Sequence, residues 1–327
     1  MSAGDTTAIG RFEKHLLAVD VYLDTYINDV LFTGKLVKSL LIDANPKLKE
    51  VFARSSGTVP KLIHISPLYQ EVDGKVRCLY SYILEEKSGQ KRVEKTVIRA
   101  GSYRLYVGFV ECGGSGCLRF DEIYNTLLDI SGIHKFSNHS IRAELVSVSV
   151  VDVTVHVRSV VKELLAGSGK IRVVFSSPTL LRDPLRTSKH KSLVPTPINI
   201  FSTPTYILYY LAGTLRTRSV MRTLLILHRL LNEPYSYIKT AGIRHIIYDK
   251  GENPIPTLIG YVNLYLNKTY YERYSKIYEV EKLLENVFTT MLALGIGTSR
   301  SAGFGHTVVE TIKKTERELG HATNKPK

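Results

Sequence analysis

Several features that would assign a protein class directly are absent from this 327-residue sequence. It contains no tryptophan and only three cysteines, too few for a disulfide framework or a four-cysteine zinc site. No run of about 18 apolar residues is present, so we expect no transmembrane helix. The first residues also lack an apolar signal stretch. We therefore expect a cytoplasmic protein without a membrane partner.

Motifs for metal or phosphoryl chemistry are missing as well. There is no HExxH, no paired-cysteine spacing and no GxSxG, and the ten histidines are scattered. GSGK at 167–170 is no P-loop, because Ile171 stands where that motif needs Ser or Thr, and it opens a strand instead of a helix. The sequence thus predicts neither a metal site nor a cofactor.

Positive charge is what the sequence has in excess, +14 at pH 7. Residues 1–160 contain 20 basic and 18 acidic residues, whereas residues 161–327 contain 24 and 12. This asymmetry favours a polyanionic partner held mainly by the second half. A solvated basic surface explains the charge alone equally well.

Hydrophobic periodicity predicts the same order of elements, β-α-β-β-α-β, in each half of the chain. In the first half, we expect strands and helices at 15–27 (β), 32–43 (α), 45–55 (α), 61–65 (β), 75–86 (β), 91–111 (β), 117–131 (α) and 141–157 (β). In the second half, we expect them at 170–178 (β), 203–231 (α, interrupted at Gly213), 243–251 (β), 257–268 (β), 270–294 (α) and 304–312 (β). The predicted fold is therefore α+β, with two tandem ferredoxin-like domains at 1–166 and 167–327.

The most polar loop of the second half, GIGTSRSAGFG at 295–305, lies between its last helix and its last strand. Glycines permit positive φ, and exposed amides bind phosphate oxygens. Arg300 could add a charge-assisted fork to such a site. A tight helix-to-strand turn accounts for the glycines equally well.

Three stretches together resemble the RAMP superfamily. GIGTSRSAGFG resembles its C-terminal glycine-rich signature, and RVVFSSPTLLR resembles the strand that opens the second domain. NPKLKEVFARSSGTVPKLIHISPL resembles the N-terminal stretch of its archaeal CRISPR repeat-processing endoribonucleases. The resemblance implies two ferredoxin-like domains that bind CRISPR repeat RNA and cut pre-crRNA to crRNA without metal. The 2′-hydroxyl attacks the adjacent phosphate and leaves a 2′,3′-cyclic phosphate.

The resemblance carries over to the cleavage site only in part. The family's histidine before the Pro-Lys strand is replaced here by Ala53 and Arg54, whereas Lys61 matches the strand lysine. A tyrosine that some members carry on the first helix falls near Lys38. We therefore predict a site built from cationic side chains, and the residues do not identify its general base. The predicted catalytic residues are Lys35, Lys38, Arg54 and Lys61, with His64 as a further candidate although strand alternation turns it away from Lys61.

RNA binding is predicted for the glycine loop and for two basic clusters of the second half. Such clusters suit contacts to phosphate, although a solvated face is the plain alternative. The predicted residues of the loop are Gly295, Gly297, Ser299, Arg300, Gly303 and Gly305. Those of the clusters are Arg182, Arg186, Lys189 and Lys191, followed by Arg218 and Arg222, which share a helix face.

Two other functions stay open at this stage. Because the histidine and the tyrosine are replaced, the chain could be a non-catalytic RAMP subunit that holds crRNA in a CRISPR effector complex. It could also be a general RNA-binding protein outside the CRISPR system. CRISPR repeat RNA is the predicted partner, effector subunits are further candidates, and monomer and homodimer both remain open.

Overall fold

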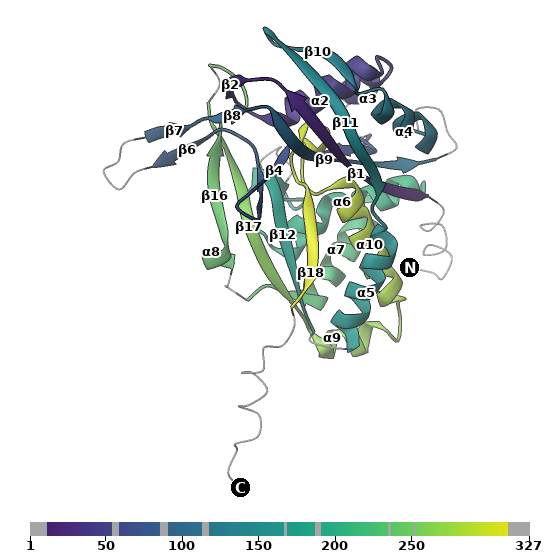
Figure 1. The fold of residues 1–327 in the computed structure, drawn as a ribbon. Helices are drawn as coiled ribbons and strands as arrows, with labels where there is room; N and C mark the ends of the chain where they lie inside the picture. Colours follow the sequence, from purple (N-terminus) through teal and green to yellow (C-terminus); the bar gives the residue numbers. More distant parts are fainter. Residues whose placement is uncertain are drawn as a thin grey trace.

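Two antiparallel sheets with helices packed against them form the body of the molecule (Figure 1). The computed structural model describes residues 12–53, 59–85, 91–112, 118–166, 169–186, 191–234, 237–251 and 253–312. In each sheet, four strands lie in the order fourth, first, third, second along their half of the chain. That order is the ferredoxin-like arrangement and confirms the predicted α+β fold with two such domains.

The first sheet is built around β1, which is buried on the side facing the helices. Its order is β10 (Gly132–Phe136), β11 (His139–Val150), β1 (Glu13–Asp24), β9 (Gly101–Glu111), β4 (Tyr69–Val72) and β5 (Lys75–Cys78), with β3 (Ile63–Ile65) also paired to β9. Leu17, Val19 and Val21 alternate along β1 and enter the core, as a half-buried strand requires. That core also receives residues of α2 (Thr33–Ala44), α3 (Leu48–Phe52) and α4 (Phe120–Leu128).

The second sheet has the order β18 (Thr307–Thr311), β12 (Lys170–Thr179), β17 (Ile255–Leu266) and β16 (Ala241–Ile246), with β15 (Leu231–Asn232) also on β17. Its helices are α6 (Pro197–Leu211), α7 (Thr217–Leu230), α8 (Tyr237–Thr240), α9 (Lys268–Tyr274) and α10 (Val280–Leu294). The predicted interruption at Gly213 is confirmed, because α6 and α7 flank it. The predicted single helix over 270–294 is wrong: α9 ends at Tyr274 and α10 begins at Val280.

Two pieces of the first half belong to the second sheet and its core. β6 (Tyr82–Glu85) and β7 (Lys91–Glu94) extend that sheet beyond β16. The strand predicted over 141–157 ends at Val150, and α5 (Val153–Ala166) follows. Val157, Val161 and Leu164 of α5 pack into the second core. The division at residue 166 stays a prediction, and the packing of α5 favours a boundary nearer residue 151.

Short elements join these layers. They are the pair β2 (Ile27–Val30) and β8 (Thr96–Ile98), the pair β13 (Leu181–Arg182) and β14 (Lys191–Ser192), and the 3₁₀ turn η2 (Arg300–Ala302) of the glycine loop. Over the part of the chain that the structure describes, no helix is long and apolar enough to cross a membrane.

The two domains meet at close backbone contacts. A Cβ on Gly34 of α2 would lie 2.4 Å from the carbonyl oxygen of Ala302, in the glycine loop. A Cβ on Gly108 of β9 would lie 1.7 Å from the carbonyl oxygen of Ala293, near the end of α10. No side chain fits in either space, so the sequence has glycine where the first domain touches the second.

Candidate functional site

A cleft of about 1060 Å³ opens where the glycine loop meets the first domain. Its walls come from α2, α3, the segment before β3, the β13–β14 pair, α6 and the start of α7. Residues of both predicted groups line it, namely Lys38, Lys61, Arg182, Lys191, Ser299 and Arg300. The structure therefore brings two of the five predicted catalytic residues, Lys38 and Lys61, and part of the predicted RNA-binding residues into one site.

Lys61 lies on the wall contributed by the first domain. Its Nζ donates a hydrogen bond to the carbonyl of Phe52, the last residue of α3, at 2.8 Å. Burial, and then the positive charges of Lys38 and Arg300, lower the pKa of Lys61 to about 8. At pH 7 about a tenth of such amines are neutral. An amine of this kind can exchange protons near neutral pH.

Lys38 and Lys35 lie on α2 but in different surroundings. Lys38 lines the cleft over the ring of Phe52, at 5.4 Å from its centroid, and burial lowers its pKa. Lys35 forms an ion pair with Asp249 and lies 4.0 Å from the centroid of the Tyr248 ring. Lys38 is therefore available to an anion in the cleft, whereas the charge of Lys35 is neutralised.

His64 is fully buried behind the cleft. Its Nδ1 lies 3.1 Å from the carbonyl oxygen of Arg300, and its Nε2 lies 3.1 Å from Nδ1 of His306. Because a carbonyl only accepts, Nδ1 of His64 carries the proton and Nε2 accepts from His306. Burial lowers the pKa of both imidazoles, that of His306 to about 4. In this position His64 joins the two domains and has no exposed atom that could reach RNA.

Arg300 is buried as well, with 6% of its surface exposed. One guanidinium nitrogen donates to the carbonyl of Leu294 at 2.7 Å and the other to the carbonyl of Lys61 at 2.8 Å. Burial lowers the pKa of this guanidinium to about 10. The predicted contact of Arg300 with phosphate stays a prediction, and this burial does not favour it, because the side chain is covered and both terminal nitrogens already donate to main-chain carbonyls.

The four glycines of the loop serve backbone packing. Gly295, Gly297, Gly303 and Gly305 all have positive φ and are buried. A Cβ on Gly297 would lie 2.2 Å from the carbonyl oxygen of Leu180, and one on Gly305 would lie 2.0 Å from that of Ile296. Of the residues predicted to bind RNA in this loop, Ser299 is the exposed one. The predicted phosphate contacts through the glycines do not fit this burial.

The basic residues of the second half divide between the cleft and the outer surface. Arg182 and Lys191 are exposed, face each other in the β13–β14 ladder and line the cleft. Arg186 pairs with Asp183 at 3.3 Å. The exposed Arg218 and Arg222 lie on α7, outside the cleft lining, and Arg222 donates to the hydroxyl of Tyr278. Arg54 and Lys189 lie outside the described residues.

Aromatic side chains of the cleft were missed by the sequence reasoning. Phe52, Tyr206 and Tyr248 line it together with Lys61. Such rings can stack on unpaired bases and tolerate any base, since each base has a π-face. Tyr206 lies among the apolar residues of α6, and the hydrophobic periodicity of this helix does not show which of its side chains are exposed. A local signal for this role was therefore absent.

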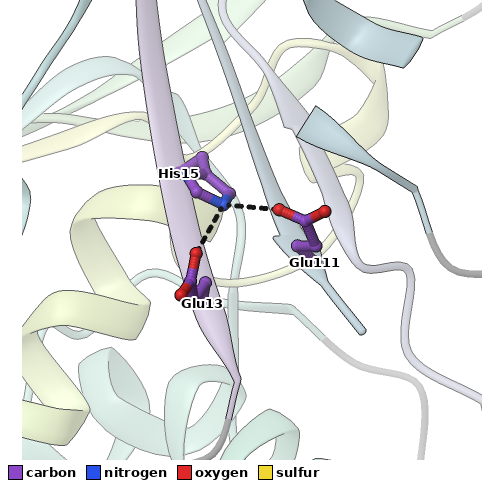
Figure 2. A group of neighbouring side chains, drawn as sticks. All are labelled: Glu13, His15 and Glu111. Carbon is purple, nitrogen blue, oxygen red and sulfur yellow. Dashed lines mark hydrogen bonds and ion pairs between the residues drawn. The ribbon is translucent and has the colours of Figure 1, made fainter. Parts of the chain in front are cut away.

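A histidine and two glutamates form a separate group where strands β1 and β9 of the first sheet start and end. Figure 2 shows Glu13 and His15 of β1 and Glu111 of β9 pointing toward one another. Nε2 of His15 lies 3.2 Å from Glu111 and 3.7 Å from Glu13. The three could hold a metal ion, but a protonated imidazole pairs with both carboxylates equally well. None of the three lines the cleft.

The fold of the chain is similar to that of several solved CRISPR proteins. The structure is similar to that of Cas6 from Thermus thermophilus, with a TM-score of 0.52 and 10% identity over 92% of this chain and all of that chain. It is also similar to a Cas6 product complex (TM-score 0.50, 13% identity, 91% of this chain and all of that one). A partial complex of Cas6-RT-Cas1 with Cas2 is 14% identical over 91% of this chain and 46% of that chain, with a TM-score of 0.50.

These likenesses are likenesses of fold. They confirm, at the level of the fold, the resemblance to repeat-processing RAMP proteins that the sequence indicates. No protein-family profile and no curated protein matches the sequence.

Proposed function

We propose that the chain is an endoribonuclease that binds CRISPR repeat RNA in the cleft and cuts it without metal. The observation that carries the proposal is the position of Lys61, a half-buried lysine with a lowered pKa, on the same cleft as Lys38, Arg182 and Lys191. A cleft with several cations and aromatic rings suits an RNA strand whose phosphates and bases are both contacted.

The reaction needs three groups. A base takes the proton of the 2′-hydroxyl, an acid protonates the leaving 5′-oxygen, and positive charge stabilises the dianionic phosphorane. Lys61 suits the first or the second role, because its pKa of about 8 leaves both forms populated near neutral pH. Lys38 suits the third, since it lines the same wall and has no ion-pair partner among the described residues.

Arg182, Lys191 and Ser299 would hold the strand on the other wall. The first two are exposed cations side by side, and they can bind successive phosphates. The half-buried rings of Tyr206 and Tyr248 would stack on bases near the scissile bond, whereas Phe52 is buried in the first core. Whether the protein acts as a homodimer or with effector subunits stays a prediction.

A second function follows from one observation, the burial of both histidines near the cleft. His64 and His306 are buried and neither lines the cleft, so the described part of the cleft offers no imidazole for proton transfer. A RAMP subunit that holds crRNA without cutting would need only the cations and the rings. A general RNA-binding protein would show the same affinity for unrelated RNA at a fixed salt concentration.

The test is to incubate the purified protein in EDTA with a labelled CRISPR repeat from the same genome and to analyse the ends of the products. A single cut with a 2′,3′-cyclic phosphate and a 5′-hydroxyl is the expected result. Tight binding without a cut would instead support the non-catalytic subunit. Equal binding of a scrambled RNA would support the general RNA-binding protein.

A further inference from the structure

Arg300 is a cation in the interior with no carboxylate beside it. It is 6% exposed, and no carboxylate among the described residues pairs with it. Burying a charge is costly, and such groups are normally paired or strongly hydrogen-bonded. The partners of this guanidinium are two main-chain carbonyls from different domains. Its burial is therefore not explained by an ion pair.

One of the two carbonyls belongs to Leu294, the last residue of α10. The last carbonyls of a helix lack partners within the helix and carry partial negative charge. A guanidinium at 2.7 Å satisfies one of them and interacts favourably with the helix dipole. This contact anchors Arg300 to α10, the helix that precedes the glycine loop.

The other carbonyl belongs to Lys61, which precedes β3 and lies outside its ladder. The ladder itself begins at Ile63, paired with Phe109. The carbonyl of Lys61 is therefore held by Arg300 at 2.8 Å and not by a neighbouring strand. A second hydrogen bond joins the same two segments, because Nδ1 of His64 donates to the carbonyl of Arg300 itself.

We propose that Arg300 is a positioning residue whose guanidinium fixes the main chain at Lys61, and with it the Lys61 amine, on the wall of the cleft. The inference rests on the proposed function, in which Lys61 transfers a proton. The cationic groups facing the Lys61 amine are Lys38 on α2 and Arg300 itself, and the neutral His64 lies behind them. Arg300 thus sets both the place of the amine and part of its electrostatic surroundings.

The alternative role for Arg300, direct binding of a phosphate, requires donors free to face the cleft. Two of the five N–H groups of the guanidinium are bonded to carbonyls, and the side chain is almost entirely covered, so its remaining donors have little access to the cleft. Ser299, the preceding residue, is exposed and can contact RNA in its place.

The first measurement follows the Lys61 amine in the free protein. Acylation by acetic anhydride is followed against pH by mass spectrometry of the peptide with Lys61, and the exposed Lys49 serves as an internal reference. In Arg300→Met the pH midpoint of Lys61 acylation should move upward, because a nearby positive charge is lost. Arg300→Lys keeps a charge and should restore the midpoint at least in part. Arg182→Met, on the opposite wall, should leave it unchanged.

The second measurement is single-turnover cleavage beside RNA affinity. Arg300→Met should slow cleavage about 10²-fold, since small misplacements of a reacting group have effects of that size. Its Kd for an uncleavable 2′-deoxy repeat should stay within about threefold. Arg300→Lys should remain slow, because an ammonium cannot bridge two carbonyls as a planar fork does. That variant carries the test if Arg300→Met does not fold.

An unchanged Lys61 midpoint in folded Arg300→Met would overturn the proposal and leave Arg300 as a helix cap. A loss of affinity with an unchanged cleavage rate would also overturn it, in favour of a phosphate contact. If the midpoint shifts as expected but the wild-type protein cuts no RNA, Arg300 still acts on the Lys61 amine, and it is the endoribonuclease assignment that fails.

Discussion

Nε2 of His64 and Nδ1 of His306 lie 3.1 Å apart, although 242 residues separate them in the chain. The two rings are nearly parallel, and the ring of Tyr106 stacks on His306 from the first sheet. Both imidazoles are neutral in this arrangement, because the protonated Nδ1 of His306 donates to the unprotonated Nε2 of His64. A proton added to His64 would turn its accepting Nε2 into a second donor and break this bond between the domains, whereas a proton added to His306 would place a charge in the interior.

Acid should therefore destabilise the protein in a defined range. The pKa of His306 is about 4 in the folded protein and 6.5 in an unfolded chain, so between these values the unfolded state binds more protons. Above pH 6.5 the titration of His306 should not lower the free energy of unfolding. It should fall by about 1.4 kcal/mol per pH unit from His306 alone as the pH drops toward 4. Urea unfolding at a series of pH values measures this slope.

A variant separates His306 from the carboxylates that also titrate in acid. His306→Asn keeps a donor near the position of Nδ1 and removes the titrating ring, so its unfolding free energy should depend less on pH between 4 and 6.5. His139→Asn, at an exposed position, should keep the wild-type slope. Identical slopes for His306→Asn and the wild type would show that the buried pair does not control acid stability.

Lys61 offers the sharpest test of the cleavage chemistry. Lys61→Ala should slow single-turnover cleavage by about 10²–10⁴-fold, the usual contribution of a general acid–base group. Its affinity for the 2′-deoxy repeat should change far less. The wild-type rate should rise with pH up to about 8 if the neutral amine is the base, because the pKa of Lys61 is about 8. Lys49→Ala, on the exposed side of α3, is the control.

Lys61→Arg distinguishes proton transfer from simple attraction. An arginine keeps the charge but does not lose its proton in proteins. Loss of cleavage with normal binding in this variant supports proton transfer by Lys61. Normal cleavage would assign Lys61 to electrostatic stabilisation, and equal losses of binding and cleavage in Lys61→Ala would make it a phosphate anchor.

At Gly34, a substitution by alanine should have two opposite effects on the free energy of unfolding. In a helix, replacing glycine by alanine normally stabilises by about 1 kcal/mol. At Gly34 the new Cβ would meet the carbonyl oxygen of Ala302 at 2.4 Å. We expect the clash to dominate and Gly34→Ala to lower the unfolding free energy by about 1–3 kcal/mol, as overpacking does. Thermal or urea unfolding measures the change.

Gly242→Ala is the matched control, because the nearest atom to its Cβ would be a side-chain carbon of Ile259 at 3.9 Å. That variant should lie within about 0.5 kcal/mol of the wild type. A stabilised Gly34→Ala would mean that the glycine loop moves away from α2 at little cost.

The order of elements was predictable because it depends on local periodicity. One exception, beside the break between α9 and α10, is α5, whose residues 153–161 are rich in valine and read as a continuing strand. Asp152 is a local sequence signal for a helix start at this point, because aspartate is a preferred N-cap residue. In the structure its carboxylate accepts a hydrogen bond from the amide of Val155, as an N-cap does. Packing of Val157 and Leu164 against the second core outweighs the strand propensity of this segment.

The site was predictable where one element of one domain places a basic side chain in the cleft. Lys61, Arg182 and Lys191 line the cleft as single basic residues placed by their own elements. The roles of Arg300 and His306 depend on carbonyls and rings of the other domain, more than 200 residues away. No pattern in one sequence shows which loop arginine is covered when two domains close on each other.

The arginines of α7 are candidates for RNA binding outside the cleft. Arg218 and Arg222 are exposed on one face of α7, and neither has a carboxylate partner among the described residues. If both bind phosphates of a single strand, the double change to Gln should flatten the slope of log K against log salt by about 1.4, about 0.7 for each contact. The position of the cut should not change. Arg142→Gln, whose arginine pairs with Glu144 at 3.4 Å, should keep the wild-type slope. An unchanged slope in the double variant would confine the RNA to the cleft.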